Sequence, residues 1–354
     1  MASLAAACGL AMALVGGGYS VAQACGMFRS VRLSPEERPT MSREKVLLIH
    51  DAEKGEQHFI REVAFARAGD PLGFVVPTPS RPTVAEVETT PFTQLRNSFS
   101  FLPVIGIGGG SGSESGYGRG SGAGFGGRGV TVLEETKVGS FKTYVLAATD
   151  EQALATWLSD NDLVASEGAE AWLEHYVRMG FYYVAMRYDP PRKKRRKKKG
   201  EQEHPTAAET IRISFATPVP YYPYLEPVEP KLPTDAPRLL EVWTVGTEKV
   251  VPVGLKSEGS DHQWVRPLRA GESYSEARAG LEFALRHELE ALLPEGRLVV
   301  QSFQDQKRSR DGFGDVLFVP AAKGALDQDR IAKLEPLLGI LDPSLVPAKA
   351  EVPE

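Results

Sequence analysis

The sequence predicts an α+β protein with mainly antiparallel sheets and a few packed amphipathic helices. Short apolar or alternating runs separated by turn residues indicate strands. A smaller number of segments repeat their apolar residues at helical spacing and carry capping residues at their ends. The composition agrees with a folded chain, since 42% of its 354 residues are hydrophobic and 25% are charged.

The first half of the chain is predicted to be mostly strands. Apolar runs indicate strands at residues 45–50, 59–65, 72–76, 99–107 and 141–148. Two helices follow the last of them. Asp150 is a suitable N-cap for the first helix, which carries Leu154, Trp157 and Leu158 on one face. Ser166 opens the second helix and Gly180 ends it. The apolar stripe of this helix contains Trp172, Leu173, Tyr176 and Val177.

Two low-complexity inserts interrupt this pattern. Residues 106–129 contain 13 glycines in 24 positions, a composition that predicts a flexible loop. The Gly122-x-Gly124-x-x-Gly127 pattern inside this insert does not predict a dinucleotide site, because a strand-like run follows where a helix is required. The second insert, residues 189–209, separates strands at 181–188 and 210–215. We expect these two strands to pair as an antiparallel hairpin with the insert at its tip.

The second insert contains eight consecutive cations, which we call the basic octad. The octad consists of Arg192, Lys193, Lys194, Arg195, Arg196, Lys197, Lys198 and Lys199. The whole chain has 41 cationic and 46 acidic residues, so without the octad it carries a charge of −13. The sequence therefore describes an acidic body with one basic segment. A solvated tip and a contact with an anionic polymer both fit this segment, whereas nucleic-acid binding is not expected because no aromatic residues are interleaved.

The C-terminal half is also predicted to mix strands and helices. Tyr221, Tyr222 and Tyr224 should pack back on the body beside a proline-rich connector at 226–238. The pattern predicts a strand pair at 239–245 and 249–255, a helix at 275–293, strands at 297–303 and 315–319, and a last helix that starts near Asp327. The expected organisation is a signal peptide at 1–24, an α+β domain at 25–225, the connector, and a C-terminal α+β region at 239–354.

The N-terminus predicts export from the cytoplasm. An apolar run at 4–15 is followed by Ala22-Gln23-Ala24, the small-x-small pattern of a signal peptidase site. Cleavage between Ala24 and Cys25 would make Cys25 the first mature residue and a candidate for lipidation. The mature chain then has one cysteine and no internal disulfide, because Cys8 leaves with the signal. The expected location is extracytoplasmic, meaning periplasmic, envelope-associated or secreted, with no transmembrane segment after cleavage.

Four separated segments resemble one known family. The first two are Ala24-Cys25-Gly26 with Phe28, and Phe74 to Ser80, which ends in Pro-x-Pro-Ser. The other two are the strand-to-helix segment from Tyr144 to Asn161, and Tyr176 to Phe181 together with Ile211, Ile213 and Phe215. These segments resemble the bacterial exported family called domain of unknown function 2330, over roughly residues 25–225. The resemblance implies an exported domain, and it implies no activity.

No motif identifies catalytic residues, a cofactor site or a metal site. The six histidines lack the spacing of a zinc helix, and a single mature cysteine excludes zinc sites built on cysteines. The chain has no Gly-x-Ser-x-Gly nucleophile elbow. The sequence therefore favours a non-enzymatic binding or structural module of the cell envelope, with an anionic polymer or another envelope protein as its partner. The alternative is an extracytoplasmic hydrolase whose site is assembled from residues far apart in the sequence.

Overall fold

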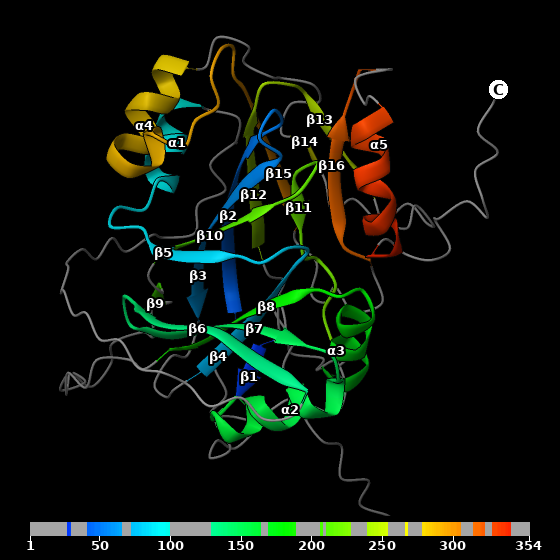
Figure 1. The fold of residues 1–354 in the computed structure, drawn as a ribbon. Coiled ribbons are helices and arrows are strands. Elements are labelled where there is room, and N and C mark those ends of the chain that lie inside the picture. Colours follow the sequence, from blue (N-terminus) through cyan, green and yellow to red (C-terminus); the bar gives the residue numbers. More distant parts are fainter. Residues whose placement is uncertain are drawn as a thin grey trace, which may run out of the picture.

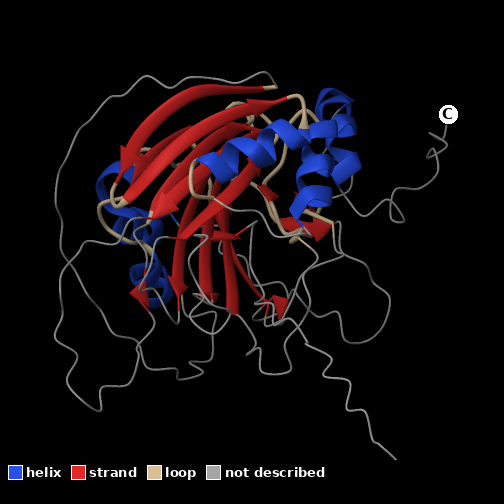
Figure 2. Ribbon diagram, turned by 90° about the horizontal axis from the view of Figure 1, so that it is seen from below, coloured by secondary structure: helices blue, strands red, loops and turns tan. Residues whose placement is uncertain are grey.

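The fold, seen in a computed structural model, is α+β with mostly antiparallel sheets, as predicted (Figure 1). The structure describes residues 27–29, 41–65, 72–99, 129–163, 169–188, 206–207, 210–227, 239–253, 266–267, 278–305, 314–322 and 328–340. The signal region, Ala24 and Cys25, most of the glycine-rich insert and the basic octad lie outside these residues. Figure 2 shows that strands form the centre of the molecule and that helices lie around it.

The strands form three sheets. The five-stranded sheet has the order β1 (Met27–Arg29), β4 (Leu72–Thr78), β8 (Tyr182–Tyr188), β7 (Phe141–Ala148) and β6 (Val130–Val138). The eight-stranded sheet has the order β14 (Arg266–Pro267), β15 (Val299–Asp305), β12 (Leu239–Gly246), β2 (Met41–Asp51), β3 (Glu56–Phe65), β10 (Ile211–Ala216) and β5 (Thr83–Glu86), and β9 (Thr206–Ala207) also pairs with β3. The three-stranded sheet has the order β11 (Tyr221–Tyr222), β16 (Val316–Pro320) and β13 (Val250–Val253).

The helices cover the outer faces of these sheets. They are α1 (Phe92–Ser98), α2 (Glu151–Asp160), α3 (Ala169–Arg178), α4 (Arg278–Glu290) and α5 (Gln328–Leu334), which continues as a 3-10 helix at Glu335–Ile340. In Figure 1, α1 and α4 lie together beside the eight-stranded sheet, α2 and α3 lie beside the five-stranded sheet, and α5 lies beside β16. Two of the predicted caps are present, since the Asp150 carboxylate accepts the amide N–H of Ala153 at 2.6 Å and Gly180 has a left-handed φ of 67°, whereas Ser166 lies outside the described residues.

Strand β2 explains why the eight-stranded sheet lies at the centre. Successive side chains of a strand point to opposite faces. Val46 and Leu48 pack into the core cluster shared with the five-stranded sheet, and Leu47 and Ile49 pack into the cluster under α1 and α4. A strand buried on both faces needs a continuous apolar run, which is the pattern of Lys45 to His50.

Two predicted strand pairings are wrong. Strand β8 pairs with β4 and β7, whereas β10 pairs with β3 and β5, so the segment with the octad connects two sheets and is not the tip of a hairpin. The strands predicted at 239–245 and 249–255 exist, but β12 pairs with β2 and β15, and β13 pairs with β16. The prediction assumed that strands next to each other in the sequence pair with each other. In the structure the two strands of each predicted pair belong to different sheets.

The chain beyond residue 225 shares a sheet with the first half. Strand β12 runs parallel to β2, with Trp243 opposite Leu47. Helix α1 was not predicted, since it has only seven residues and Pro91 at its N-cap position makes no side-chain cap. Within the described residues, no helix is both long enough and apolar enough to cross a membrane.

Candidate functional site

Four of the polar clusters that the described residues form bring together titratable or nucleophilic side chains from different strands and helices. None of these clusters was visible in the sequence, because each joins side chains from strands or helices far apart along the chain. Their burial and hydrogen bonds decide what each one can do. Two of them are structural, one surrounds a small pocket, and one contains a serine and a histidine.

The first cluster is an ion pair buried between the two large sheets. Arg61 of β3 lies 2.9 Å from the carboxylate of Glu44 on β2, and both side chains are at most 1% exposed. The guanidinium also lies over the ring of Phe74 of the five-stranded sheet, 4.6 Å from its centroid. Because the charges are neutralised inside the core and no solvent reaches them, this pair fixes the position of one sheet on the other.

The second cluster surrounds the buried carboxylate of Asp315, immediately before β16. The hydroxyls of Tyr176 and Tyr221 donate to it at 2.8 Å, and the backbone N–H of Leu225 donates at 2.9 Å. Burial raises the pKa of Asp315 to about 7, while these hydrogen bonds act to lower the pKa. The cluster thus attaches the C-terminal strand to α3 and to the tyrosine-rich segment, where Tyr221, Tyr222 and Tyr224 pack against the body as predicted.

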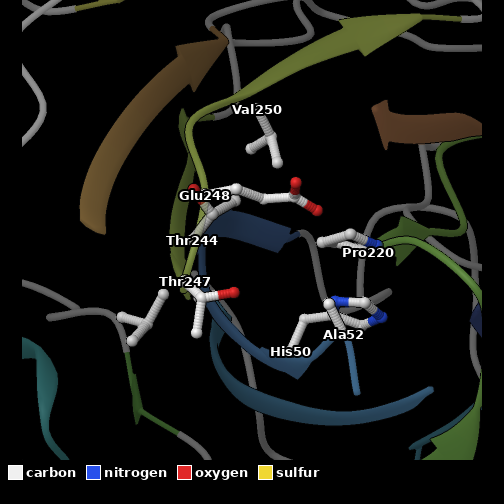
Figure 3. Close-up of a pocket in the computed structure, with 9 residues that line it drawn as sticks. His50, Ala52, Pro220, Thr244, Thr247, Glu248 and Val250 are labelled. Carbon is white, nitrogen blue, oxygen red and sulfur yellow. The ribbon is translucent and has the colours of Figure 1, made fainter. Parts of the chain in front are cut away.

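The third cluster lies around a pocket between β2, the β12–β13 turn and Pro220. Figure 3 shows the ring of His50 and the carboxylate of Glu248 on two sides of it, with Pro220 beside them. Its volume of about 10 Å³ gives room for about one water. His50 Nε2 donates to the carbonyl of Thr217 at 3.0 Å, and burial lowers the pKa of His50 to about 4.

Arg330 of α5 completes this third cluster. Its guanidinium lies 2.8 Å from the carboxylate of Glu248 and lowers the pKa of the nearby His50 further. The ion pair joins α5 to the turn between β12 and β13. The imidazole is hydrogen-bonded, the carboxylate is paired, and the space between them has the size of one water. We therefore interpret this cluster as a structural contact between α5 and the sheet, since the space is too small for a substrate.

The fourth cluster lies on the face of the eight-stranded sheet that α1 and α4 cover. Ser214 of β10 lies directly opposite His58 of β3, and its Oγ is 2.8 Å from His58 Nδ1. The other ring nitrogen, Nε2, is 3.9 Å from a carboxylate oxygen of Glu56. Burial lowers the pKa of His58. A hydroxyl, an imidazole and a carboxylate in this order are the groups that nucleophilic catalysis requires.

The outcomes for the sequence-predicted site residues differ. Ala24, Cys25 and the octad lie outside the described residues, so cleavage, lipidation and polyanion contact stay predictions. Among the histidines, His50, His58 and His175 are wholly or partly buried, and burial lowers the pKa of all three. The described residues contain no group of three or more His, Cys, Asp or Glu side chains that could hold a metal ion.

Comparison with known proteins identifies one family. The model of a family described as "Uncharacterized protein conserved in bacteria (DUF2330)" matches residues 20–224, more than half of the chain. No curated protein matches the chain. Among solved structures, the crystal structure of baculovirus P35 is similar with a TM-score of 0.36 and 11% sequence identity, covering 84% of this chain and 94% of that one.

Proposed function

We propose, from the premise that this chain belongs to the DUF2330 family of bacterial proteins, that it works outside the cytoplasm as a cell-envelope protein whose basic octad binds an anionic polymer. Export is supported by the apolar run and small-x-small site before Cys25. Polymer binding is supported by the octad, the one run of eight cations in a chain that is otherwise acidic.

The proposal that the octad binds a polymer is supported by the way in which its segment is attached to the sheets. The strand before it, β8, is an inner strand of the five-stranded sheet, and its last residue Tyr188 pairs with Leu72 and Phe141. The chain after it returns at Thr206, which pairs with Phe65 at the end of β3. Both ends of the segment are therefore held by strand pairs in two different sheets. The octad therefore belongs to a segment whose two flanking residues in the structure, Tyr188 and Thr206, are each fixed in a sheet.

The acidic body makes the contact selective. A polyanion is repelled by the rest of the chain, whose formal charge is −13, and attracted to a segment that carries +8. Binding should therefore take place at the octad and not on the rest of the chain. It should also weaken steeply with salt, since each neutralised site releases a counterion, with a slope of up to about 0.7–0.9 per contact for nucleic acids.

The test is binding of the mature chain to inorganic polyphosphate, a simple polyanion, at rising salt. Replacing the eight cations by glutamine should abolish binding, whereas a variant with the same three arginines and five lysines in another order should bind as the wild type does. This control separates charge from sequence. Equal binding by the glutamine variant would disprove the role of the octad.

Export needs a separate experiment. The full-length protein is expressed in a bacterium, the cell is fractionated, and the N-terminus of the product is determined by mass spectrometry. We expect an extracytoplasmic product that begins at Cys25, and an added acyl mass would show lipidation. An unprocessed product in the cytoplasm would refute the export proposal and leave the polyphosphate result to be judged on its own.

A further inference from the structure

We propose that Ser214, His58 and Glu56 form a second, catalytic site, in which Ser214 is the nucleophile that hydrolyses small acyl esters. This inference does not rest on the octad, since it concerns a different part of the chain. It would place the activity in the hydrolase class that the sequence left open as an alternative. The argument rests on the position of three side chains on one antiparallel strand pair.

The strand pair fixes the geometry of these groups. Residues opposite each other on neighbouring strands have their Cβ atoms about 5 Å apart, which is within hydrogen-bonding reach for serine and histidine. The register places Ser214 opposite His58, and the measured distance from Oγ to Nδ1 is 2.8 Å. Glu56 precedes His58 by two residues and so lies on the same face of β3. Both strands lie inside the eight-stranded sheet, which gives the pair a rigid support.

The carboxylate of Glu56 determines where the imidazole proton lies. Because Glu56 lies beside Nε2, the tautomer with the proton on Nε2 is stabilised by its negative charge. Nδ1 then carries the lone pair and accepts the hydrogen bond from the Ser214 hydroxyl. This direction is the one that a nucleophile needs, since the base already accepts a hydrogen bond from the proton that it must remove.

The charges around His58 keep it ready to accept that proton. Burial lowers its pKa, so the ring is neutral at neutral pH. Glu56 and Asp51 act to raise the pKa of His58, and Arg212 and Lys54 act to lower it. Arg212 lies on β10, two residues before Ser214, and is half-buried. Lys54 is paired with Asp51 at 2.7 Å, so we assign to Arg212, which shares the face of Ser214 on β10, the stabilisation of an oxyanion formed next to Ser214.

The reaction is a two-step ester hydrolysis. Ser214 Oγ attacks the ester carbonyl carbon while its proton moves to His58 Nδ1. The bond between the carbonyl carbon and the ester oxygen of the alcohol part then breaks. The alcohol leaves with the proton from His58 Nδ1. Water then attacks the acyl-serine, gives one proton to Nδ1, and the acid leaves as the proton returns to Ser214 Oγ. The balance is one ester and one water converted to one acid and one alcohol.

The exposure of the pair limits the substrate. Ser214 is 7% exposed and His58 is 8% exposed, so the proposal is limited to small acyl groups. Ser214 lies opposite Thr83 of β5, and Thr83 is exposed. Because Thr83 shares the face of Ser214 and is exposed, we take the substrate to approach Ser214 over Thr83. The substrate class is a small acyl ester presented on an alcohol that stays outside.

The first experiment uses a fluorophosphonate probe on the folded mature protein, followed by mass spectrometry of the labelled peptide. We expect labelling at Ser214, loss of that label in Ser214→Ala, and normal labelling in Ser80→Ala, a serine whose hydroxyl instead donates to the carbonyl of Ala216. Circular dichroism checks that each variant is folded. Absence of label on Ser214 in the folded wild type would overturn the proposal.

The second experiment measures hydrolysis of p-nitrophenyl acetate against pH. His58→Gln should lower kcat by about 10²–10⁴-fold, the usual contribution of a general base. Glu56 is a positioning residue, so Glu56→Gln should cost less and should shift the pH at which the rate rises to lower values, because the carboxylate raises the pKa of His58. An unchanged pH profile in Glu56→Gln would contradict the assigned role. Polyphosphate binding by Ser214→Ala should be unaffected, which keeps this test separate from that of the octad.

Discussion

Replacing Asp315 by asparagine should remove most of one pH-dependent contribution to the stability of the protein. Burial raises the pKa of this carboxyl from 3.8 to about 7 in the folded chain. The folded state then binds the proton more tightly than the unfolded state, so stability that is present below pH 3.8 is lost as the pH rises towards 7. A shift of about three units corresponds to about 4 kcal/mol, or about 1.4 kcal/mol per pH unit within this window.

Asparagine has nearly the shape of the protonated acid and does not titrate. The free energy of unfolding of Asp315→Asn, minus that of the wild type, should therefore increase by about 4 kcal/mol between pH 4 and pH 7, because only the wild type loses stability. Other titrating groups cancel in this difference. The assay is urea unfolding at constant ionic strength, followed by tryptophan fluorescence, since Trp172 donates its indole N–H to the carbonyl of Leu225 beside the cluster.

The matched control is Asp329→Asn on the exposed surface of α5, which makes the same substitution outside the buried cluster. Tyr176→Phe gives a second check, because the Tyr176 hydroxyl lowers the pKa of Asp315. Its removal should move the titration to still higher pH. The reasoning is refuted if the wild type and Asp315→Asn have parallel stability curves from pH 4 to pH 7.

Three further predictions concern single positions. Gly73→Ala should destabilise the protein by about 1–3 kcal/mol, because a Cβ there would lie 1.9 Å from the side chain of Leu163; thermal unfolding measures this, and an unchanged Tm contradicts it. Asp150→Ala should cost about 1 kcal/mol through loss of the cap on Ala153, which Asp150→Ser should largely restore in the same measurement. His50 contributes stability that is lost as the pH falls from 6.5 towards 4, since burial depresses its folded-state pKa to about 4. His50→Gln should therefore make the loss of unfolding free energy between pH 6.5 and pH 4 less steep. An equally steep loss in this variant would show that other groups dominate.

The positions of the strands and helices could be predicted from the sequence more reliably than the pairing of the strands in the sheets. The apolar run at Lys45 to His50 and the Asp150 cap depend on residues close in the chain, so local patterns were sufficient. Pairing of β8 with β4 and β7 depends on which faces pack together, and that information is spread over the chain. The expectation that neighbouring strands pair therefore failed for the segment around the octad.

The Ser214–His58 pair shows the same limit for sites. Its two residues are 156 positions apart, and nothing in the local pattern around either one resembles a nucleophile motif. A strand sequence does specify which side chains share a face, since the alternation has a period of two. The sequence does not give the register between β3 and β10, and this register is what places Ser214 opposite His58. Motif searches detect sites built on one turn or helix, whereas this pair depends on a cross-strand register.

The structure also argues that the family-matched region and the rest of the chain fold as one unit. The family match ends at residue 224, yet β12 lies beside β2 in the centre of the eight-stranded sheet. Without β12, the backbone of β2 would lose its parallel partner, and Leu47 would lose the neighbouring Trp243. Asp315 adds a polar link of the same kind, because its oxygens accept hydrogen bonds from Tyr176 and Tyr221 inside the matched region. An activity of this domain therefore has to be sought in the whole chain, since residues beyond 224 complete its core.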